Sequence, residues 1–221
     1  MIRASQRMVD AERELLHNAL EKTNLSVSGT QIDQLIAYTD LLEKWNQAYN
    51  LTAIRDRREI FSRHLIESLS IAPFVTGRRR LDVGTGAGLP GVPLAILEPS
   101  VTFILLDSNG KKTRFLTEVK RSLGLSNIEV QTARVEKWEA DEPFDAVVTR
   151  AFADLATTCQ RIGHVLGQQG MLFAMKTERA NQEMFAIPDH LEQVSCRDIA
   201  IPGRDWPVQL QVIRRRLESD Q

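Results

Sequence analysis

Four glycines stand within eight residues of the stretch LDVGTGAGLPGVPLAI, residues 81–96. A backbone without side chains lets a ligand approach closely, and a turn after the first strand of a doubly wound sheet lies where such folds bind ligands. A phosphate-binding P-loop needs a lysine directly after its last glycine, yet the first lysine after Gly84 is Lys111. The stretch therefore predicts a loop that binds a nucleoside-containing cofactor and is not a P-loop.

Two cofactor types remain open for this loop. Gly84, Gly86 and Gly88 give GxGxG, one residue short of the dinucleotide fingerprint, and the preceding Leu-Asp-Val completes a pattern typical of S-adenosylmethionine methyltransferases. A pyrophosphate disfavours a neighbouring carboxylate, whereas the ammonium and sulfonium groups of S-adenosylmethionine favour Asp82. Asp107, after the next expected strand, is placed to bind both ribose hydroxyls of either cofactor. A dinucleotide therefore stays an alternative.

Composition sets limits on compartment and partners. The chain has 221 residues, 43% of them hydrophobic, which is enough for one good-sized core, and its net charge of −1 means that any nucleic-acid contact must be local. Cys159 and Cys196 are far apart, so we expect buried or partly buried thiols and no disulfide or metal site. No apolar run approaches the roughly 20 residues of a membrane span. We expect a cytoplasmic monomer without a metal.

The first third of the chain is predicted to be helical. Residues 8–72 carry helical periodicity and no proline, and they predict three helices. Thr30 with Asp33 resembles an N-terminal capping pair for the helix whose apolar face includes Ile32, Leu35 and Trp45. We place a helical extension at residues 1–76, before a second domain at 77–221.

The second domain alternates short β-rich runs with helical ones. The expected strands are RLDV (80–83), 101–107, 127–131, 144–150, 170–176 and 208–217, and the expected helices are 89–98, 110–123, 153–166 and 178–186. This alternation predicts an α/β fold with a mostly parallel sheet and helices on both faces. The final run alternates apolar and polar residues, as a half-exposed or edge strand does.

Further segments extend the pattern beyond the loop. They are KWNQAYNLTAIRD (44–56), RHLIESLSIAP (63–73), LLDSNGKKTRFL (105–116), RVE (134–136), FDAVVTRAFADL (144–155) and FAMK (173–176). Together with the glycine stretch, they resemble the bacterial small-subunit rRNA guanine-N7 methyltransferases, a family also known as glucose-inhibited division protein B. The resemblance runs in register from about residue 30 to residue 176.

This resemblance implies a Rossmann-like class I methyltransferase fold and a reaction. The expected reaction transfers a methyl group from S-adenosylmethionine to N7 of guanine 527 of 16S rRNA, in the rRNA or in a small-subunit assembly intermediate. Carried over, Gly84 and Leu89 contact the cofactor, Val135 and Glu136 flank the adenine, and Arg150 borders the place where the methyl donor meets the guanine.

Four places depart from the family pattern. Glu67 stands where the family usually has Asp, Asn109 where it has Leu, and Thr177 where it has Gly. Residues 206–208 read Trp-Pro-Val where a basic residue or His often begins the late strand. These departures concern contacts on the substrate side and leave the cofactor loop untouched.

Ring-nitrogen methylation also agrees with what the chain lacks. Guanine N7 has a free lone pair, so no general base is required, and Arg150 is expected to position reactants. Methylases of exocyclic amino groups commonly carry [ND]PP[YF] after the fourth strand, and this place reads TRAFAD (149–154). Pyrimidine C5 methylation needs a nucleophilic cysteine, and Cys159 is expected inside a helix.

Basic and polar residues outside the sheet are candidates for RNA contacts, because a guanine in folded RNA is reached by splaying it out and holding the flanking phosphates. They are Asn50, Arg55, Arg63, His64, Lys111, Lys112, Arg114 and Lys176. His64 is equally well explained as a hydrogen-bonded helix residue, Trp45 is expected in the core, and Arg214 to Arg216 on a solvated edge.

Two alternatives remain open beside rRNA methylation. One is a methyltransferase of a small molecule or protein, for which the basic clusters have no role. The other is a non-catalytic dinucleotide-binding module, which would bind NADH and not S-adenosylmethionine.

Overall fold

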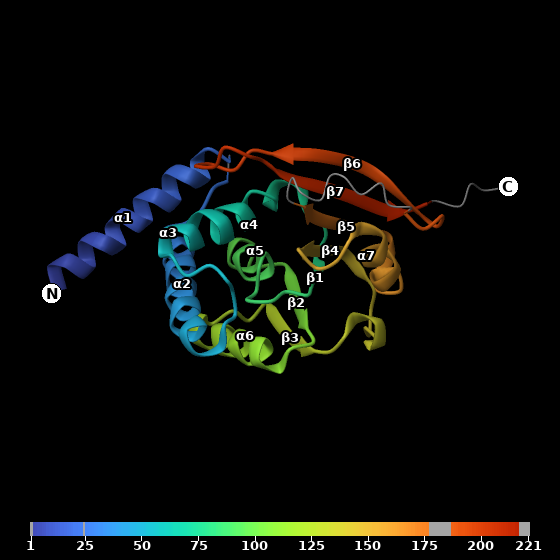
Figure 1. The fold of residues 1–221 in the computed structure, drawn as a ribbon, viewed down its shortest axis with the longest axis horizontal. Helices are drawn as coiled ribbons and strands as arrows, with labels where there is room; N and C mark the ends of the chain where they lie inside the picture. The colour runs from blue at the N-terminus through green and yellow to red at the C-terminus, as the bar shows by residue number, and fades with distance from the viewer. Residues whose placement is uncertain (1, 24, 177–186, 217–221) are drawn as a thin grey trace.

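The computed structural model describes residues 2–23, 25–176 and 187–216, with side chains described from residue 10 onward. Seven strands form one sheet in the order β3-β2-β1-β4-β5-β7-β6 (Figure 1). They are β1 (Arg79–Val83), β2 (Thr102–Asp107), β3 (Ile128–Thr132), β4 (Phe144–Arg150), β5 (Leu166–Lys176), β6 (Leu191–Ile199) and β7 (Val208–Arg215). Strands β1 to β5 are parallel, and β7 runs antiparallel between β5 and β6. The predicted mostly parallel α/β sheet is confirmed.

Helices cover both faces of this sheet, and further helices precede it in the chain. They are α1 (Ile2–Glu21), α2 (Gly29–Tyr49), α3 (Arg57–Ile60), a π-helix (Phe61–Ile66), α4 (Glu67–Leu69), α5 (Gly91–Leu97), α6 (Gly110–Leu123) and α7 (Leu155–Ile162), with short 3₁₀ turns at Ala72–Phe74 and Val135–Lys137. On β2, Phe103 and Leu105 join the core under α5 and α6, whereas Ile104 and Leu106 join the core under α7. This alternation is the two-residue period of a strand buried on both faces.

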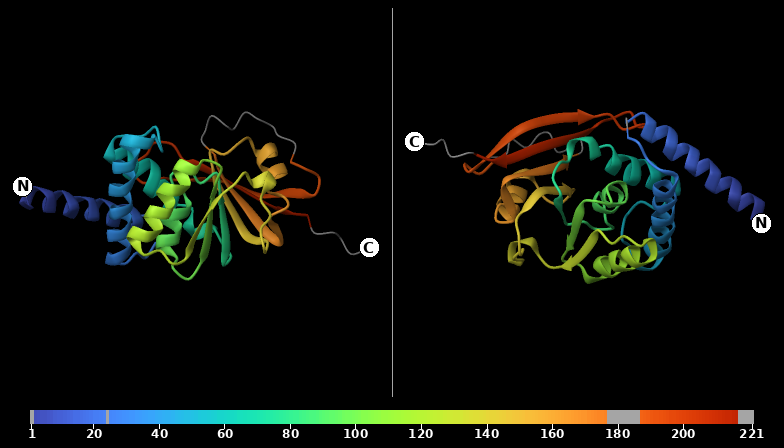
Figure 2. Two further views of the ribbon diagram at one scale, coloured as in Figure 1. Left: turned by 90° about the horizontal axis from the view of Figure 1, so that it is seen from below. Right: turned by 180° about the vertical axis from the view of Figure 1, so that it is seen from behind.

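Helix α2 forms a second layer, packed on α5 and α6 on the side away from the sheet (Figure 2). Gln31 Nε2 donates to the carbonyls of Ile96 (3.0 Å) and Leu97 (2.9 Å) at the end of α5. Gln34 Nε2 donates to the carbonyl of Leu123 (3.1 Å) at the end of α6. Because the last carbonyls of a helix have no partner within it, α2 supplies hydrogen bonds that these two helices lack.

Helix α1 projects from the body of the molecule, with the N-terminus at its outer end (Figure 1). Its second half is anchored, because Leu16 and Leu20 are buried. The Arg57 side chain ties this half to α2 by ion pairs with Glu12 on α1 and with Asp40 (2.7 Å) on α2. Because Arg57 is the first residue of α3, its side chain holds α1, α2 and α3 together at one point.

The predicted helical beginning is confirmed, but two details differ. Helix α2 begins after Ser28, not at Thr30: Gln31 N donates to Ser28 Oγ (3.2 Å), and Ser28 N donates to Gln31 Oε1 (2.9 Å). Ser-x-x-Gln is itself a capping box, so the predicted pair was two residues late. The third helical run is interrupted by the π-helix, which periodicity alone does not reveal.

One strand was missed, one pair of alternatives is resolved, and the expectation for Cys196 is wrong. Strand β6 was not predicted, because most of its residues face solvent and only Leu191 and Ile199 are buried. That strand is the edge of the sheet, so β7 is half-exposed but internal. Cys196 lies on this edge and is exposed, whereas Cys159 is buried in α7 as expected. The helix predicted at 178–186 and the departure at Thr177 lie outside the described residues.

Candidate active site

The glycine loop follows β1 and folds over the carboxyl ends of β1 and β2. Gly84, Gly86 and Gly88 all have positive φ (65°, 62° and 94°), a conformation that other residues adopt at a cost. The amide of Gly84 donates to the carbonyl of Leu106 (2.9 Å), and the amide of Gly86 donates to Asp107 Oδ2 (2.9 Å). The second of these hydrogen bonds holds the Asp107 side chain against the edge of the loop.

Asp82 lies beneath the loop instead of at its surface. Its side chain is fully buried, and Oδ2 accepts hydrogen bonds from Thr85 Oγ1 (2.7 Å) and from the amide of Gly91 (2.8 Å). Burial raises the pKa of Asp82 to about 6, against the lowering effect of these two hydrogen bonds. The carboxylate thus shapes the loop, and its contact with the cofactor ammonium stays a prediction.

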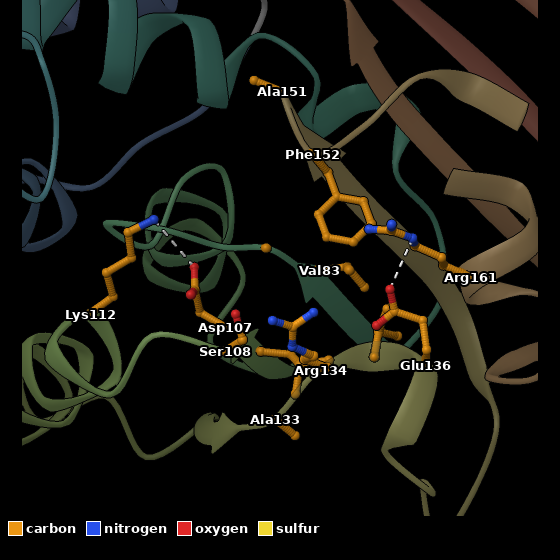
Figure 3. Close-up of a pocket in the computed structure, with 13 residues that line it drawn as sticks. Val83, Asp107, Ser108, Lys112, Ala133, Arg134, Glu136, Ala151, Phe152 and Arg161 are labelled. Carbon is orange, nitrogen blue, oxygen red and sulfur yellow. Dashed lines mark ion pairs between the residues drawn. The ribbon is translucent and has the colours of Figure 1, made fainter. Parts of the chain in front are cut away.

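A cavity of about 310 Å³, here called the nucleoside cavity, opens on one side of the loop (Figure 3). Gly84, Asp107, Val135, Glu136 and Phe152 are among its lining residues. Asp107 lies at one end beside Lys112 Nζ (3.6 Å), and Glu136 pairs with Arg161 Nε (2.9 Å) at the other. A carboxylate for a ribose diol and an aromatic face for a base are the groups that an adenosine requires.

A second cavity of about 330 Å³, the loop cavity, lies on the other side of the glycines. Gly84, Gly86, Leu89 and Arg150 line it. Gly88 lines neither of these cavities, because a Cβ there would meet Val92 and Leu116 inside the core. Of the predicted loop residues, Gly84, Gly86 and Leu89 thus line a cavity, and Gly88 serves packing.

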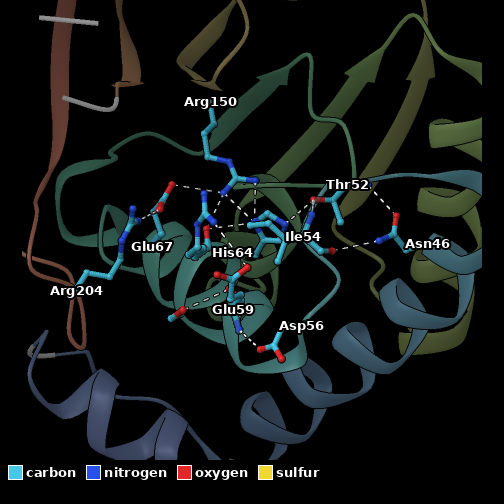
Figure 4. A network of polar contacts seen from close by, with 11 residues as sticks. Asn46, Thr52, Ile54, Asp56, Glu59, His64, Glu67, Arg150 and Arg204 are labelled. Atoms are coloured by element: carbon cyan, nitrogen blue, oxygen red, sulfur yellow. Dashed lines mark hydrogen bonds and ion pairs between the residues drawn. The ribbon is translucent and has the colours of Figure 1, made fainter. Parts of the chain in front are cut away.

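Arg150 stands at the end of β4, at the centre of a polar network (Figure 4). Its Nη1 donates to the carbonyl of Arg63 (3.0 Å) and lies 3.3 Å from His64 Nδ1 and 3.5 Å from Glu67 Oε1. The π-helix supplies Arg63 and His64, and Glu67 is the first residue after it, with its amide donating to the carbonyl of His64. A π-helical segment within a helical run is frequent at functional sites.

His64 is buried inside this network and lines the loop cavity. Its Nε2 lies 2.9 Å from Thr52 Oγ1, and Nδ1 faces the Arg150 guanidinium. Burial, and then the charge of Arg150, lower the pKa of His64 to about 3. The arrangement fits a neutral ring that accepts from Arg150 at Nδ1 and donates from Nε2.

This histidine gives a prediction for acid stability. Between about pH 6.5 and pH 3 an unfolded chain protonates His64 and the folded chain does not, so the free energy of unfolding falls as the pH falls through that window. We expect His64→Gln to lose this contribution, which urea titrations at several pH values would measure. The raised pKa of Asp82 acts in the opposite sense between about pH 4 and pH 6, so only the difference between variant and wild type isolates His64. Equal pH slopes in the two proteins would contradict the prediction.

Tyr38 is a site residue that sequence reasoning missed. It is fully buried on α2, and its hydroxyl donates to the carbonyl of Ala87 in the glycine loop (2.7 Å). Burial raises the pKa of this hydroxyl above its ordinary value, so it remains a donor. A tyrosine on an apolar helix stripe gives no sequence signal of a partner 49 residues away.

Tyr38→Phe tests this contact. Removing the donor from a buried carbonyl costs about 1–3 kcal/mol, and we expect weaker cofactor binding with a smaller change in kcat, because the loop loses a support and no reacting group. Urea unfolding and calorimetry measure the two effects. Tyr49→Phe, on the exposed end of the same helix, is the control. A Tyr38→Phe protein that matched this control would show that the hydroxyl does not hold the loop.

The remaining RNA candidates fall into two groups. Arg63 and Lys112 line the loop cavity, and Lys176 lines a third cavity of about 240 Å³ at the ends of β4 and β5, the strand-end cavity. Asn50, Arg55, Lys111 and Arg114 are exposed and line none of these three cavities, with Asn50 Oδ1 accepting from Arg55 Nη2 (2.7 Å). The structure also adds Arg134, Phe152 and Arg161 to the nucleoside cavity. Arg134 and Phe152 lie in segments of the family pattern, RVE (134–136) and FDAVVTRAFADL (144–155), whereas Arg161 had no sequence signal.

The described residues contain no group of three or more His, Cys, Asp or Glu that could hold a metal ion. Over the same part of the chain, no helix is long and apolar enough to cross a membrane.

The strand order, the glycine loop and the acid at the end of β2 define the class of protein. The fold is similar to an S-adenosylmethionine-dependent O-methyltransferase from Thermotoga maritima, with a TM-score of 0.52 and 14% identity over 69% of this chain and 66% of that one. A methyltransferase from Aquifex aeolicus gives a TM-score of 0.52 and 14% identity, over 70% of this chain and 92% of that one. This chain has the class I fold of S-adenosylmethionine-dependent methyltransferases, and S-adenosylmethionine is its cofactor.

The family is shown by closer relatives. A family model described as rRNA small subunit methyltransferase G matches residues 31–205. Ribosomal RNA small subunit methyltransferase G of Marinobacter nauticus is 46% identical over 200 residues, which cover 90% of this chain and 94% of that protein. The Escherichia coli K12 protein of the same name is 42% identical over 195 residues, 88% of this chain and 94% of that protein. The chain belongs to the rRNA small subunit methyltransferase G family, and the dinucleotide-binding alternative is set aside.

Proposed function

We propose that this protein methylates N7 of guanine 527 of 16S rRNA, in an assembly intermediate of the small ribosomal subunit. The observation that carries the proposal is the 46% identity over 90% of the chain with a ribosomal RNA small subunit methyltransferase G. The geometry supports it, because Arg150 and the glycine loop line one cavity.

We assign the nucleoside cavity to the adenosine half of the cofactor and the loop cavity to its methionine half. Asp107 would accept hydrogen bonds from the ribose hydroxyls, the backbone at Val135 and Glu136 would flank the adenine, and Gly84, Gly86 and Leu89 would let the methionine portion pass close to the main chain. Asp82 and Gly88 support this loop from within the core. When bound, S-adenosylmethionine supplies a methyl carbon activated by a sulfonium.

The residues around this site suit methylation at an unprotonated ring nitrogen. Guanine N7 loses no proton, so orientation is the main task of the protein, and well-oriented reactants account for about 7–11 kcal/mol of barrier lowering. Cys159 does not suit C5 methylation of a pyrimidine, because it is buried in α7 and burial raises the pKa of its thiol to about 11. Arg150 is the proposed positioning group between cofactor and base.

Exposed cations would hold the RNA backbone around the target base. Arg63 lies at the loop cavity, Lys176 at the strand-end cavity, and Arg55, Lys111 and Arg114 on the surface. Binding by such a local set in a protein of net charge −1 should weaken steeply with salt, because each phosphate contact releases counterions.

The two proposed domains share this work. Residues 77–221 would carry the cofactor, and residues 1–76 would complete the substrate side through the π-helix. A ribosomal substrate places the reaction in the cytoplasm, and we take the monomer as the active form.

The test is transfer of labelled methyl from S-adenosylmethionine to small subunits, or to 16S rRNA, that lack the modification. We expect label in 7-methylguanosine at a single position. Absence of label on RNA, with cofactor binding intact by calorimetry, would overturn the proposal and favour a small-molecule or protein substrate.

A further inference from the structure

Three cavities of this protein meet at one residue. Ala151, which follows β4, lines the nucleoside cavity, the loop cavity and the strand-end cavity. It is an alanine with φ of 52°, in the left-handed region. Such a conformation costs about 1–3 kcal/mol and persists mainly at functional sites that hold it in place. The reacting atoms are therefore expected beside Ala151, with a reactant on each side of it.

The strand-end cavity is not needed by the cofactor. The nucleoside and loop cavities contain the residues assigned above to adenosine and methionine, whereas the strand-end cavity contains no residue of the glycine loop. Its volume of about 240 Å³ is below the roughly 300–1,000 Å³ of pockets for drug-sized ligands, which suits one planar base. Ala153, Met175 and Val208 provide apolar walls, and Glu67 and Arg150 provide a polar side.

We propose that the strand-end cavity receives the target guanine and that Glu67, beside Arg150, reads its Watson–Crick edge. The proposal rests on the proposed function, since it names the subsite of that same reaction. A flipped base is commonly read by hydrogen bonds to this edge and by contact of its faces with apolar side chains. Glu67 and Arg150 also line the loop cavity, so the two cavities adjoin at these side chains.

The order of donors and acceptors favours guanine. A carboxylate only accepts hydrogen bonds and a guanidinium only donates them, and Glu67 Oε1 lies 3.5 Å from Arg150 Nη1. Guanine presents the complement side by side: its O6 accepts, and its N1–H and N2–H groups donate. Adenine presents an amino donor and an N1 acceptor, which would set donor against guanidinium and acceptor against carboxylate.

The surroundings hold this carboxylate in place. Arg204 lies on the turn before β7, its side chain is buried, and it pairs with Glu67 Oε2 (Figure 4). Its guanidinium carbon lies 5.0 Å from the centre of the Trp206 ring. A carboxylate has about four acceptor positions on its two oxygens, so these ion pairs leave capacity for a base. Trp206 is one of the departures from the family pattern, and here it supports the arginine that orients Glu67.

The same carboxylate would assist the transfer itself. As the N7–CH₃ bond forms and the S–CH₃ bond breaks, the positive charge passes from the sulfonium to the guanine ring, and a neutral thioether leaves without any proton transfer. A carboxylate at the ring edge is attracted more strongly to the cationic product than to the neutral base. Glu67 would therefore bind the transition state better than the ground state.

Inosine, which lacks only the 2-amino group of guanosine, tests the contact. Small subunits would be reconstituted with 16S rRNA ligated to carry guanosine or inosine at the target, and single-turnover rates at N7 compared. A hydrogen bond to a charged group corresponds to roughly a 10-fold preference or more, so we expect wild type to favour guanosine by at least roughly 10-fold. Glu67→Gln should bring the two rates close together, and Glu67→Asp should retain the preference.

The control is Glu59→Gln, an exposed acid nearer the start of the same helical run, which should leave the preference unchanged. Because the ratio is taken within one enzyme preparation, loss of folded protein cancels. Equal wild-type rates on the two RNAs, or a Glu67→Gln enzyme with the wild-type preference, would overturn the guanine subsite while leaving the proposed function intact. No methylation of either RNA by wild type would instead refute the proposed function and this subsite with it.

Discussion

Arg150→Ala is expected to lower kcat/KM for methyl transfer by roughly 100-fold, the scale on which misplacement of reactants by about 1 Å reduces a rate. The guanidinium touches the carbonyl of Arg63, the ring of His64 and the carboxylate of Glu67, and it borders the loop and strand-end cavities. Alanine removes this common support, so both reactants lose their fixed positions. Single-turnover transfer at saturating cofactor measures the loss.

Binding measurements separate positioning from collapse of the fold. The nucleoside cavity does not contain the Arg150 side chain, so we expect the variant to retain most of its affinity for adenosine, the half of the cofactor assigned to that cavity, by calorimetry. Arg150→Lys keeps the charge but not the planar fork, and its rate should lie between those of Arg150→Ala and wild type. An Arg150→Ala enzyme within about twofold of wild type would show that the network has no part in the reaction.

Gly88→Ala is expected to lower the free energy of unfolding by about 2–6 kcal/mol. About 1–3 kcal/mol arises from an alanine forced to φ of 94°, and about 1–3 kcal/mol from overpacking. The added Cβ would lie 2.5 Å from Val92 Cγ2 and 2.7 Å from Leu116 Cδ2, both in fully buried side chains. Movement of the loop should also weaken cofactor binding. Urea unfolding followed by circular dichroism gives the stability.

Gly29→Ala and Gly110→Ala are matched controls. Both glycines begin helices, and a Cβ at either would meet nothing within 4 Å. Alanine at such positions changes stability by at most about 1 kcal/mol. If Gly88→Ala behaved like these two, the glycine would be interchangeable and the third glycine of the loop would have no packing role.

The parts of the fold that follow a strong local pattern could be predicted. Helix α6 begins at Gly110 and ends at Leu123 as its periodicity indicates, and β4 spans Phe144–Arg150 as expected. Strand β6 escaped prediction because an edge strand with solvent-facing side chains has no alternation to read. Its pairing with β7 is a long-range property of the sheet.

The residues of the candidate site also fall into those that a local pattern could predict and those that it could not. The loop glycines and Asp107 were predicted because a sheet of this type places the ends of β1 and β2 together. Tyr38 and Arg204 reach the site from distant segments, and no spacing rule connects them to it. Asp82 also has a role that its motif position did not indicate, since its buried carboxylate binds the loop itself.

The hydrogen bonds from α2 to the glycine loop and to the ends of α5 and α6 make occupancy of the cofactor site and attachment of α2 one coupled equilibrium. Free energies of binding are reciprocal, so a cofactor that steadies the loop must also steady α2. Helix α2 (Gly29–Tyr49) reaches the loop through the hydrogen bond between Tyr38 and Ala87, residues 49 apart in sequence. The amide hydrogens of this helix should therefore exchange more slowly when S-adenosylmethionine is present. By the same reciprocity, a substitution that detaches α2 should weaken cofactor binding. The factor of this weakening should equal the factor by which bound cofactor slows the opening of α2.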